Sequence, residues 1–205
     1  MNTMLTTMKL SPAEAQKAQH FLHDVYVNQL GWQPQPNNPS GWVTRCDADG
    51  NYFTDIYERC ACWFGVFDVD ELIAAMRMIA PLENKLEVEL YRPIPPKFKR
   101  GGFKLCEINR LVIKREYLDS KALVALVQKM TDHVVEQRID YLFLATTRPA
   151  PANFCESLGF VAIDPPDQGF KYSPSDPYPV HLFCLDCQDR VRMEGLNAQC
   201  RALLK

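Results

Sequence analysis

Apolar and polar positions follow two different periods along the chain, and their mixture predicts an α/β fold. Residues 12–29 have apolar side chains at helical spacing along one face. That face consists of Phe21, Leu22, Val25 and Tyr26. Ser11 is a suitable N-cap with Glu14 three positions later, and Gly31 is placed to end the helix. The pattern therefore predicts a helix from residue 12 to about residue 29.

Three apolar runs after this helix have the length of strands. Residues 60–67 (CACWFGVF) and 72–79 (LIAAMRMI) flank a short polar turn and are predicted to form a hairpin. A long connection follows over residues 80–104, with four prolines and few periodic apolar positions. The run at 105–113 (LCEINRLVI) then predicts another strand.

The second half of the chain alternates between helical and strand patterns. Asp119-Ser120 is a candidate cap for a helix with Leu123, Leu126, Val127, Met130 and Val134 at helical spacing. The later elements are a strand at 141–145, a helix at 151–158 closed by Gly159, and strands at 160–163 and 179–185. This order predicts one α/β domain over residues 1–205, with a mixed central sheet flanked by helices.

Composition narrows the class of protein. The 205 residues include 23 basic and 25 acidic side chains, so bulk attraction to nucleic acid is not indicated. No apolar run approaches the roughly 20 residues that cross a bilayer. The opening MNTMLTTMKL has no basic region followed by a long apolar one, as a secretory signal would. We expect a cytoplasmic protein without stable membrane insertion.

Eight cysteines raise the alternatives of disulfides and metal binding. Cys184 and Cys187 have the spacing of a zinc knuckle, but a second knuckle is missing and the four histidines are scattered. Free cysteine is also a common buried apolar residue. We expect reduced core thiols and no bound metal or other cofactor.

Residues 47–58 (DADGNYFTDIYE) match the ligand spacing of a calcium-binding EF-hand loop. The matching residues are Asp47, Asp49, Asn51, Asp55 and Glu58. However, Tyr52 occupies the position that needs glycine, and neither flank has a helical pattern. We therefore reject the calcium site.

A second interpretation of Asp55 and Glu58 is that they enter a buried strand and need cationic partners, because unpaired buried carboxylates are costly. Arg77 lies within an otherwise apolar run, and Glu107 and Arg110 occupy another. We expect these charged side chains to converge in one cluster. Such a cluster has two interpretations: an ion-pair network that only fixes the fold, or a functional site.

Ordered motifs from Val25 to Phe160 resemble a known group of enzymes. The motifs are Val25-Tyr26 with Leu30-Gly31-Trp32, Asp55-Ile56-Tyr57-Glu58, Ala75-Met76-Arg77-Met78-Ile79, Glu107-Ile108-Asn109-Arg110-Leu111, Thr146-Thr147 and Leu158-Gly159-Phe160. They resemble the motifs of the acyl-homoserine-lactone (autoinducer) synthases and the long-chain N-acyl amino acid synthases, both of the GNAT acyltransferase superfamily. The resemblance implies a GNAT-like fold and transfer of an acyl chain from a thioester to an amine.

Three departures bear on the substrates. Leu22 stands where autoinducer synthases usually have arginine, which weakens the case for S-adenosylmethionine as acceptor. Asn109 stands where serine is usual. Between the strand at 105–113 and the next helix, the chain has no Q/R-x-x-G-x-G/A loop to cradle the pyrophosphate of CoA. The missing loop fits a donor carried on acyl carrier protein, although CoA stays an alternative.

The resemblance implies roles for the charged cluster and for Trp32. Glu107 is the candidate base, because a partly buried carboxylate can have a raised pKa. Asp55 and Glu58 would orient a cationic amine, while Arg77 and Arg110 balance them and grip a carboxylate of an amino-acid-like acceptor. Trp32 would close over the cleft.

The resemblance also implies where the donor binds. Backbone N–H groups near Leu111, Val112 and Ile113 would meet the oxyanion, and Thr146 and Thr147 belong to the late strand beside the thioester. The basic stretch between Arg92 and Arg115 is either a solvated loop or a landing patch for an acidic carrier protein. The favoured patch residues are Lys97, Lys99, Arg100 and Lys104.

The leading hypothesis is therefore an N-acyltransferase that makes an N-acyl signal or a lipoamino acid. A true autoinducer synthase that uses S-adenosylmethionine is the first alternative, and a CoA-dependent GNAT enzyme for small acyl groups is the next. A non-catalytic binding module on the same fold is the alternative from another class.

Overall fold

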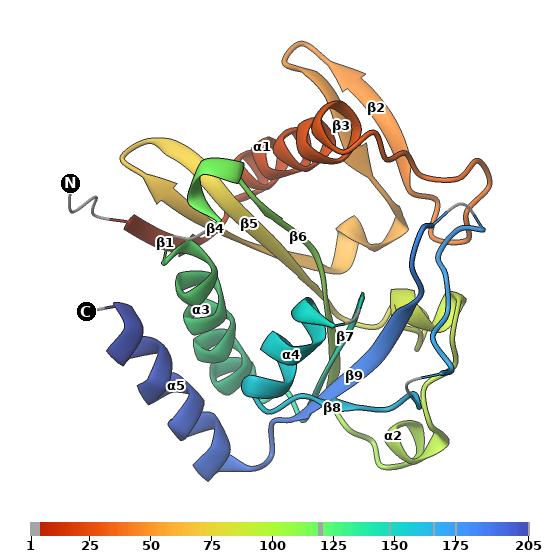
Figure 1. Ribbon diagram of the computed structural model, residues 1–205, viewed down its shortest axis with the longest axis vertical. Helices are drawn as coiled ribbons and strands as arrows, with labels where there is room; N and C mark the ends of the chain where they lie inside the picture. The colour runs from red at the N-terminus through yellow and green to blue at the C-terminus, as the bar shows by residue number, and fades with distance from the viewer. Residues whose placement is uncertain (1–4, 119–120, 148, 166, 175, 205) are drawn as a thin grey trace.

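The computed structural model describes residues 5–118, 121–147, 149–165, 167–174 and 176–204. Its centre is a seven-stranded sheet of order β1-β4-β5-β6-β7-β9-β8, and a two-stranded hairpin, β2–β3, stands apart from it (Figure 1). In the large sheet β6 and β7 are parallel and all other neighbours are antiparallel. The expected mixed central sheet is confirmed.

The strands of the large sheet are β1 Leu5–Lys9, β4 Ala61–Asp68, β5 Glu71–Ile79, β6 Leu105–Ile113, β7 Tyr141–Thr147, β8 Val161–Ala162 and β9 Val180–Asp186. The separate hairpin consists of β2 Val43–Asp47 and β3 Gly50–Thr54. The helices are α1 Pro12–His23, α2 Pro96–Arg100, α3 Ala122–Gln137, α4 Ala150–Ser157 and α5 Arg190–Leu204. The expected cap at Asp119-Ser120 lies outside the described residues.

Helix α1 begins as the sequence predicts. The Ser11 hydroxyl accepts a hydrogen bond from the Glu14 backbone N–H, and the Glu14 carboxylate accepts one from the Ser11 backbone N–H at 2.8 Å. The chain stays helical to Gln29, but residues Asp24–Gln29 form a π-helix. A π turn inside a helix shifts the side chains that follow it. Here the shifted segment leads directly into Trp32, and Gly31 adopts a positive φ of 67°.

Helices and apolar clusters cover both faces of the sheet. Helices α3, α4 and α5 pack on one face, and α1 with the β2–β3 hairpin lies on the other (Figure 1). The side chains of Phe64, Met76 and Leu142 point toward α3–α5, whereas those of Trp63 and Ala75 point toward α1. The α1 face also carries the charged side chains discussed below.

Strands β6 and β7 pair only over their first halves. Their ladder runs from Leu105↔Tyr141 to Ile108↔Leu144, after which β6 pairs with β5 alone and β7 with β9 alone. In the same stretch the β5–β6 register shifts, so that Ala75 faces Val112 but Arg77 faces Asn109. Two residues of β6 therefore oppose Met76, which is a β-bulge.

Among the strands and α-helices described, four elements were not anticipated from the sequence: β1, the β2–β3 hairpin, α2 and α5. Helix α2 lies within the stretch at 80–104 that was expected to be a connection. The hairpin is mostly exposed, so it lacks the alternation of buried and exposed positions that marks a half-buried strand. Helix α5 buries Met193, Leu196 and Cys200 along an otherwise polar surface. These three positions follow the i, i+3, i+7 spacing of one helix face, a signal that the prediction did not use.

Candidate active site

Arg77 is the centre of a buried charged cluster. Its side chain on β5 is 1% exposed, and all five of its N–H groups donate hydrogen bonds. Two go to Asp55 at 2.9 and 2.8 Å, one to Glu58 at 2.5 Å, one to Glu87 at 3.1 Å and one from Nε to Asn109 at 2.8 Å. A guanidinium has no sixth N–H to offer, so Arg77 is saturated in this arrangement.

Arg110 supplies the second positive charge, and the bulge in β6 positions it. Its φ of 54° is left-handed, which is unusual for a residue with a side chain. Because alternate residues of a strand point to opposite faces, Arg110 would normally point away from Asn109. At the bulge it joins Asn109 instead, and Nη2 donates to Asp55 at 3.1 Å and to Glu87 at 2.5 Å.

The three carboxylates of this cluster come from two separate segments and share only two guanidinium groups. Asp55 caps the short 3₁₀ helix Ile56–Cys60, which also carries Glu58. Burial alone raises the pKa of Asp55, but Arg77 and Arg110 hold that pKa below its ordinary value. The cluster therefore keeps an excess of negative charge.

Glu87 was not identified from the sequence, although it contacts both arginines. It lies in the 3₁₀ helix Glu87–Leu90 within the long connection after β5, and it is 2% exposed. The local sequence LEVEL alternates apolar and acidic residues, which would place its acids in solvent if the segment were a strand. The 3₁₀ turn removes that alternation and points Glu87 inward.

Glu107 lies beside this cluster but has no ion pair within the described chain. It is 1% exposed and accepts hydrogen bonds from the Val88 backbone N–H at 2.9 Å and from the Asn109 amide at 3.3 Å. Burial and, next, the neighbouring charge of Glu87 raise the pKa of Glu107 to about 8. It is thus a carboxyl group poised to exchange a proton near neutral pH.

Asn109 connects the two halves of the site. Its side-chain oxygen accepts from Arg77, and its amide donates to Glu87 at 2.8 Å as well as to Glu107. Serine has one hydroxyl donor and cannot repeat this set of contacts. The change from the serine that is usual in the resembling enzymes therefore has a specific structural role here.

An aromatic wall borders the charged cluster on the α1 side. The Arg110 guanidinium stacks over Trp42 at 3.4 Å from the ring centroid, and Trp42 packs on Trp32 with 4.6 Å between centroids. Trp32 also donates from Nε1 to Asp176 at 3.3 Å, which links this wall to the loop before β9. Leu22, by contrast, is 1% exposed within the apolar cluster under α1 and is placed to pack rather than to bind.

The expected donor residues flank the gap where β6 and β7 separate. Leu111, Val112 and Ile113 lie on β6 beyond its last pair with β7. Thr146 and Thr147 lie on β7 beyond its last pair with β6 and face His181 and Val180 on β9. All five residues therefore lie in the parts of β6 and β7 where these two strands no longer pair with each other.

The four basic residues of the expected patch divide into two groups. Lys97 and Arg100 line a surface pocket of about 870 Å³ together with Phe98, Tyr141 and Cys184. Lys99 forms an ion pair with Glu89 at 2.7 Å, and the Lys104 ammonium donates to the Gln137 carbonyl at 2.7 Å. Arg192 of α5 adds a cation to the pocket that the sequence reasoning did not include.

The acidic stretch with EF-hand spacing does not form a helix-flanked loop. Asp47 ends β2 and Asp49 lies in the hairpin turn, while Asp55 and Glu58 turn inward to Arg77. The rejection of an EF-hand is thereby confirmed. The eight cysteines are all free thiols, and five of them are buried, as expected for core residues.

Comparison with known proteins shows which proteins resemble this chain in sequence and in fold. No protein-family model matches the chain. An uncharacterized N-acetyltransferase of Dictyostelium discoideum is 32% identical over 74 residues, which is 35% of this chain and 32% of that protein. The chain thus matches only about a third of the length of this curated relative.

Solved structures match over nearly the whole chain. FeeM, an N-acyl amino acid synthase from uncultured soil microbes, has a TM-score of 0.69 at 17% identity and covers 97% of both chains. BjaI, a CoA-dependent acyl-homoserine lactone synthase, has a TM-score of 0.62 at 16% identity, covering 96% of this chain and 89% of its own. A GNAT-family acetyltransferase of Staphylococcus aureus Mu50 has a TM-score of 0.54 at 11% identity over 90% and 99%.

These matches define the class by fold: the chain has the GNAT acyltransferase fold, and its structural neighbours include both kinds of enzyme that its motifs resemble. Among the described residues, no helix is both long enough and apolar enough to cross a membrane.

Proposed function

We propose that this chain is an N-acyltransferase, with residues 1–205 acting as one domain. It moves an acyl chain from a thioester of acyl carrier protein or CoA to the amine of an amino-acid-like acceptor. The product is an N-acyl signal or a lipoamino acid. The observation that carries the proposal is Glu107, a buried carboxyl group on β6 whose pKa is raised to about 8. It lies beside the cluster around Arg77 and next to Ile108, the last residue of β6 that pairs with β7.

Glu107 is the general base of the proposed reaction. In its ionised form it removes a proton from the acceptor amine, directly or through one water, as the amine nitrogen attacks the thioester carbonyl carbon. The carbon–nitrogen bond forms, the carbon–sulfur bond breaks, and the proton leaves with the thiol product. A base is most effective when its pKa is close to the working pH, and the environment of Glu107 meets that demand.

The charges of the cluster around Arg77 indicate where the acceptor binds. Asp55, Glu58 and Glu87 outnumber the two arginines, so a cationic amine is attracted to this end of the cluster. Arg110 uses only Nη2 for the contacts described, which leaves Nε and Nη1 to bind an acceptor carboxylate. We therefore assign carboxylate recognition to Arg110 and a structural role to the saturated Arg77. Trp32 closes the aromatic side.

The donor enters the gap between β6 and β7. Backbone N–H groups near Leu111, Val112 and Ile113 receive the oxyanion, and Thr146 and Thr147 line the thioester arm. The segment 114–121 (KREYLDSK) contains no glycine, which supports a donor without the CoA pyrophosphate. Lys97 and Arg100 are the residues of the basic patch most available to an acidic carrier protein, because Lys99 and Lys104 are engaged.

Two alternatives remain within the class. BjaI is a CoA-dependent acyl-homoserine lactone synthase of similar fold, which keeps CoA as a donor candidate. An autoinducer synthase that uses S-adenosylmethionine is disfavoured by Leu22, whose buried side chain cannot replace a binding arginine. From another class, a non-catalytic module would use the charged cluster only as an internal ion-pair network. We further propose that the protein works in the cytoplasm.

Mass spectrometry of extracts tests the proposal. Bacteria expressing the wild-type chain are compared with bacteria expressing Glu107→Gln, which keeps the size of the side chain and removes its charge. A set of new N-acylated species found only with wild type supports the proposal and identifies the acceptor and the chain length. If purified wild type yields no amide from any thioester of a carrier-protein and CoA panel, the binding-module alternative is correct.

A further inference from the structure

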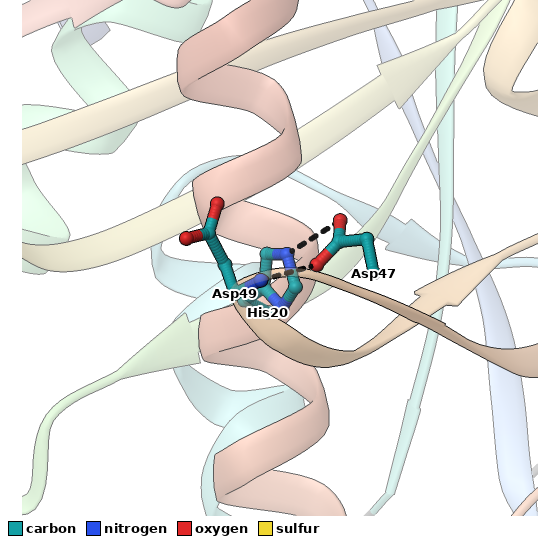
Figure 2. Close-up of side chains that lie close together, drawn as sticks. All are labelled: His20, Asp47 and Asp49. Atoms are coloured by element: carbon teal, nitrogen blue, oxygen red, sulfur yellow. Dashed lines mark hydrogen bonds and ion pairs between the residues drawn. The ribbon is translucent and has the colours of Figure 1, made fainter.

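Helix α1 and the β2–β3 hairpin bring together three metal-ligating side chains far from the charged cluster. His20 lies on α1, Asp47 at the end of β2 and Asp49 in the turn that follows. One ligand atom from each side chain lies within 4.8 Å of the others. Figure 2 shows the Asp47 and Asp49 carboxylates on either side of the His20 imidazole. Asp47 and Asp49 belong to the acidic stretch that failed as an EF-hand.

The hydrogen bonds of His20 leave one ring nitrogen without a normal partner. Nδ1 lies 2.9 Å from the Asn51 backbone carbonyl, and Nε2 lies 3.2 Å from Oδ2 of Asp47. Both oxygens only accept hydrogen bonds, whereas a neutral imidazole has a single N–H. With Nδ1–H donated to the carbonyl, Nε2 faces the carboxylate as a lone pair. A cation has to lie between them, and that cation is either a proton or a metal ion.

Several features favour a metal ion. A histidine that binds a metal through one nitrogen usually donates its other N–H to a backbone carbonyl or a carboxylate, as His20 does to Asn51. Bonds of 2.0–2.1 Å in a tetrahedral site place ligand atoms about 3.4 Å apart, close to the 3.2 Å between Nε2 and Asp47. Tyr52 packs against the imidazole with 5.2 Å between ring centroids and holds its orientation.

The carboxylate of Asp49 adds a negative charge that a proton on the imidazole alone does not neutralise. Asp49 donates its backbone N–H to Asp47, but its own carboxylate has no hydrogen bond or ion pair within the described chain. Two carboxylates beside one imidazolium would leave a net negative charge, and no lysine or arginine of the described chain pairs with either of them. A divalent ion neutralises both.

We propose that His20, Asp47 and Asp49 bind a first-row divalent transition-metal ion such as Zn²⁺, with water as the fourth ligand. One imidazole and two carboxylates suit this class, whereas Ca²⁺ requires six to eight oxygen ligands. Asp49 borders a surface hollow of about 490 Å³ that also includes His20 and Asn51, so the ion reaches the site from solvent. This site departs from the expectation of no metal.

The ion fastens the hairpin to α1. His20 is on the helix and both aspartates are at the hairpin tip, so the ion ties these two elements together. Without it they are joined by the hydrogen bonds from Gln16 to Asp47 at 2.6 Å and from His20 to the Asn51 carbonyl, and by packing. The far end of β3 leads directly to Asp55 of the charged cluster. The role assigned to the ion is structural, and it does not depend on the proposed acyl transfer.

The test is zinc binding by isothermal titration calorimetry, with thermal unfolding as a second readout. Asp49→Asn is the key variant because it removes the negative charge of a proposed ligand. No contact is described for the Asp49 side chain, so the substitution breaks none. Asp70→Asn, in the exposed turn between β4 and β5, is the matched control. All proteins carry Cys46→Ser, since the exposed Cys46 thiol next to Asp47 is a competing ligand.

We expect one Zn²⁺ per chain, a rise in unfolding temperature, and a loss of at least about tenfold in affinity in Asp49→Asn but not in Asp70→Asn. His20→Gln should lose binding in the same way. Zinc binding that is absent, or equal in Asp49→Asn and Asp70→Asn, would overturn the proposal. Ca²⁺ binding of similar affinity would also overturn the proposal, because Ca²⁺ prefers oxygen ligands to imidazole.

Discussion

Arg77 and Asp55 form a two-point ion pair in the interior, with N–O distances of 2.9 and 2.8 Å and side chains that are each 1% exposed. The pair joins β5 to the loop after the β2–β3 hairpin. Because Arg77 also serves Glu58, Glu87 and Asn109, it fixes the positions of three carboxylates at once.

Removal of the Arg77 charge should destabilise the protein strongly. Arg77→Met leaves Asp55 and Glu87 buried with Arg110 as their only described cation. Loss of one partner from a buried ion pair costs about 3–5 kcal/mol. We expect a decrease of that size in the free energy of unfolding, measured by urea denaturation at neutral pH. Arg77→Lys keeps the positive charge but loses the planar set of N–H donors. Its free energy of unfolding should lie between those of wild type and Arg77→Met.

A small effect of Arg77→Met, below about 1 kcal/mol, would mean that the carboxylates of the cluster are solvated or protonated rather than paired. Arg59, at the end of the 3₁₀ helix Ile56–Cys60, is a suitable control because no ion pair is described for it. Arg59→Met should leave stability nearly unchanged.

The pH dependence of stability should report on Glu107. Its pKa is raised from 4.5 in an unfolded chain to about 8 in the fold, so the folded state holds a proton that the unfolded state releases. The stabilisation from this group is therefore complete below pH 4.5 and is lost as pH rises toward and through about 8. Glu107→Gln cannot ionise and lacks this loss.

Urea denaturation of wild type and Glu107→Gln from pH 5 to pH 9 measures the difference. We expect the wild type to lose stability relative to the variant across this range. A constant difference between the two proteins would show that Glu107 titrates at its ordinary pKa, and the assignment of a poised base would then fail.

Asn109 should tune the same proton. Its amide donates to Glu107 and thereby favours the ionised carboxylate, which lowers the pKa. Asn109→Ala removes this donor, so the pKa of Glu107 should rise further. In the proposed reaction, the pH–rate profile of the variant should shift to more alkaline pH, measured as kcat/KM against one acceptor amine. A shift toward acid pH would contradict the hydrogen-bond assignment.

Arg110 should select acceptors that carry a carboxylate. Arg110→Lys keeps a positive charge but loses the planar fork and its stacking on Trp42. We expect KM to rise by about 10- to 100-fold for an amino acid acceptor, since a hydrogen bond to a charged group contributes about 1.5–3 kcal/mol. The matched amine without a carboxylate should show little change. Equal effects on both acceptors would move the role of Arg110 to the internal network.

The sequence predicted the fold well where buried positions produce a regular spacing of apolar residues along the chain. Strand β6 agrees with its predicted bounds, and β4 and β5 agree within one residue. The hairpin carrying Asp47 was missed because most of its residues face solvent. Helix α5 was missed although its buried residues Met193, Leu196 and Cys200 stand at helical spacing, because charged residues and Gly195 interrupt the pattern between them.

The charged cluster was predicted from an energetic rule rather than from a period. A charged residue within an apolar strand needs a partner, and this rule pointed from Asp55 and Glu58 to Arg77, Glu107 and Arg110. In the structure Asp55 and Glu58 contact Arg77, and Arg110 contacts Asp55. Glu107 lies beside this group. The rule did not reach Glu87 because its segment is short and lies outside any strand.

The most direct test of the account is amide formation by the purified protein. Acyl carrier protein and CoA thioesters of several chain lengths are offered with a panel of amino acids, and N-acyl product and released thiol are measured together. We predict equal amounts of both products with wild type, and a rate reduced at least about 100-fold in Glu107→Gln. An undiminished rate in that folded variant, or no product from any donor, would contradict the account.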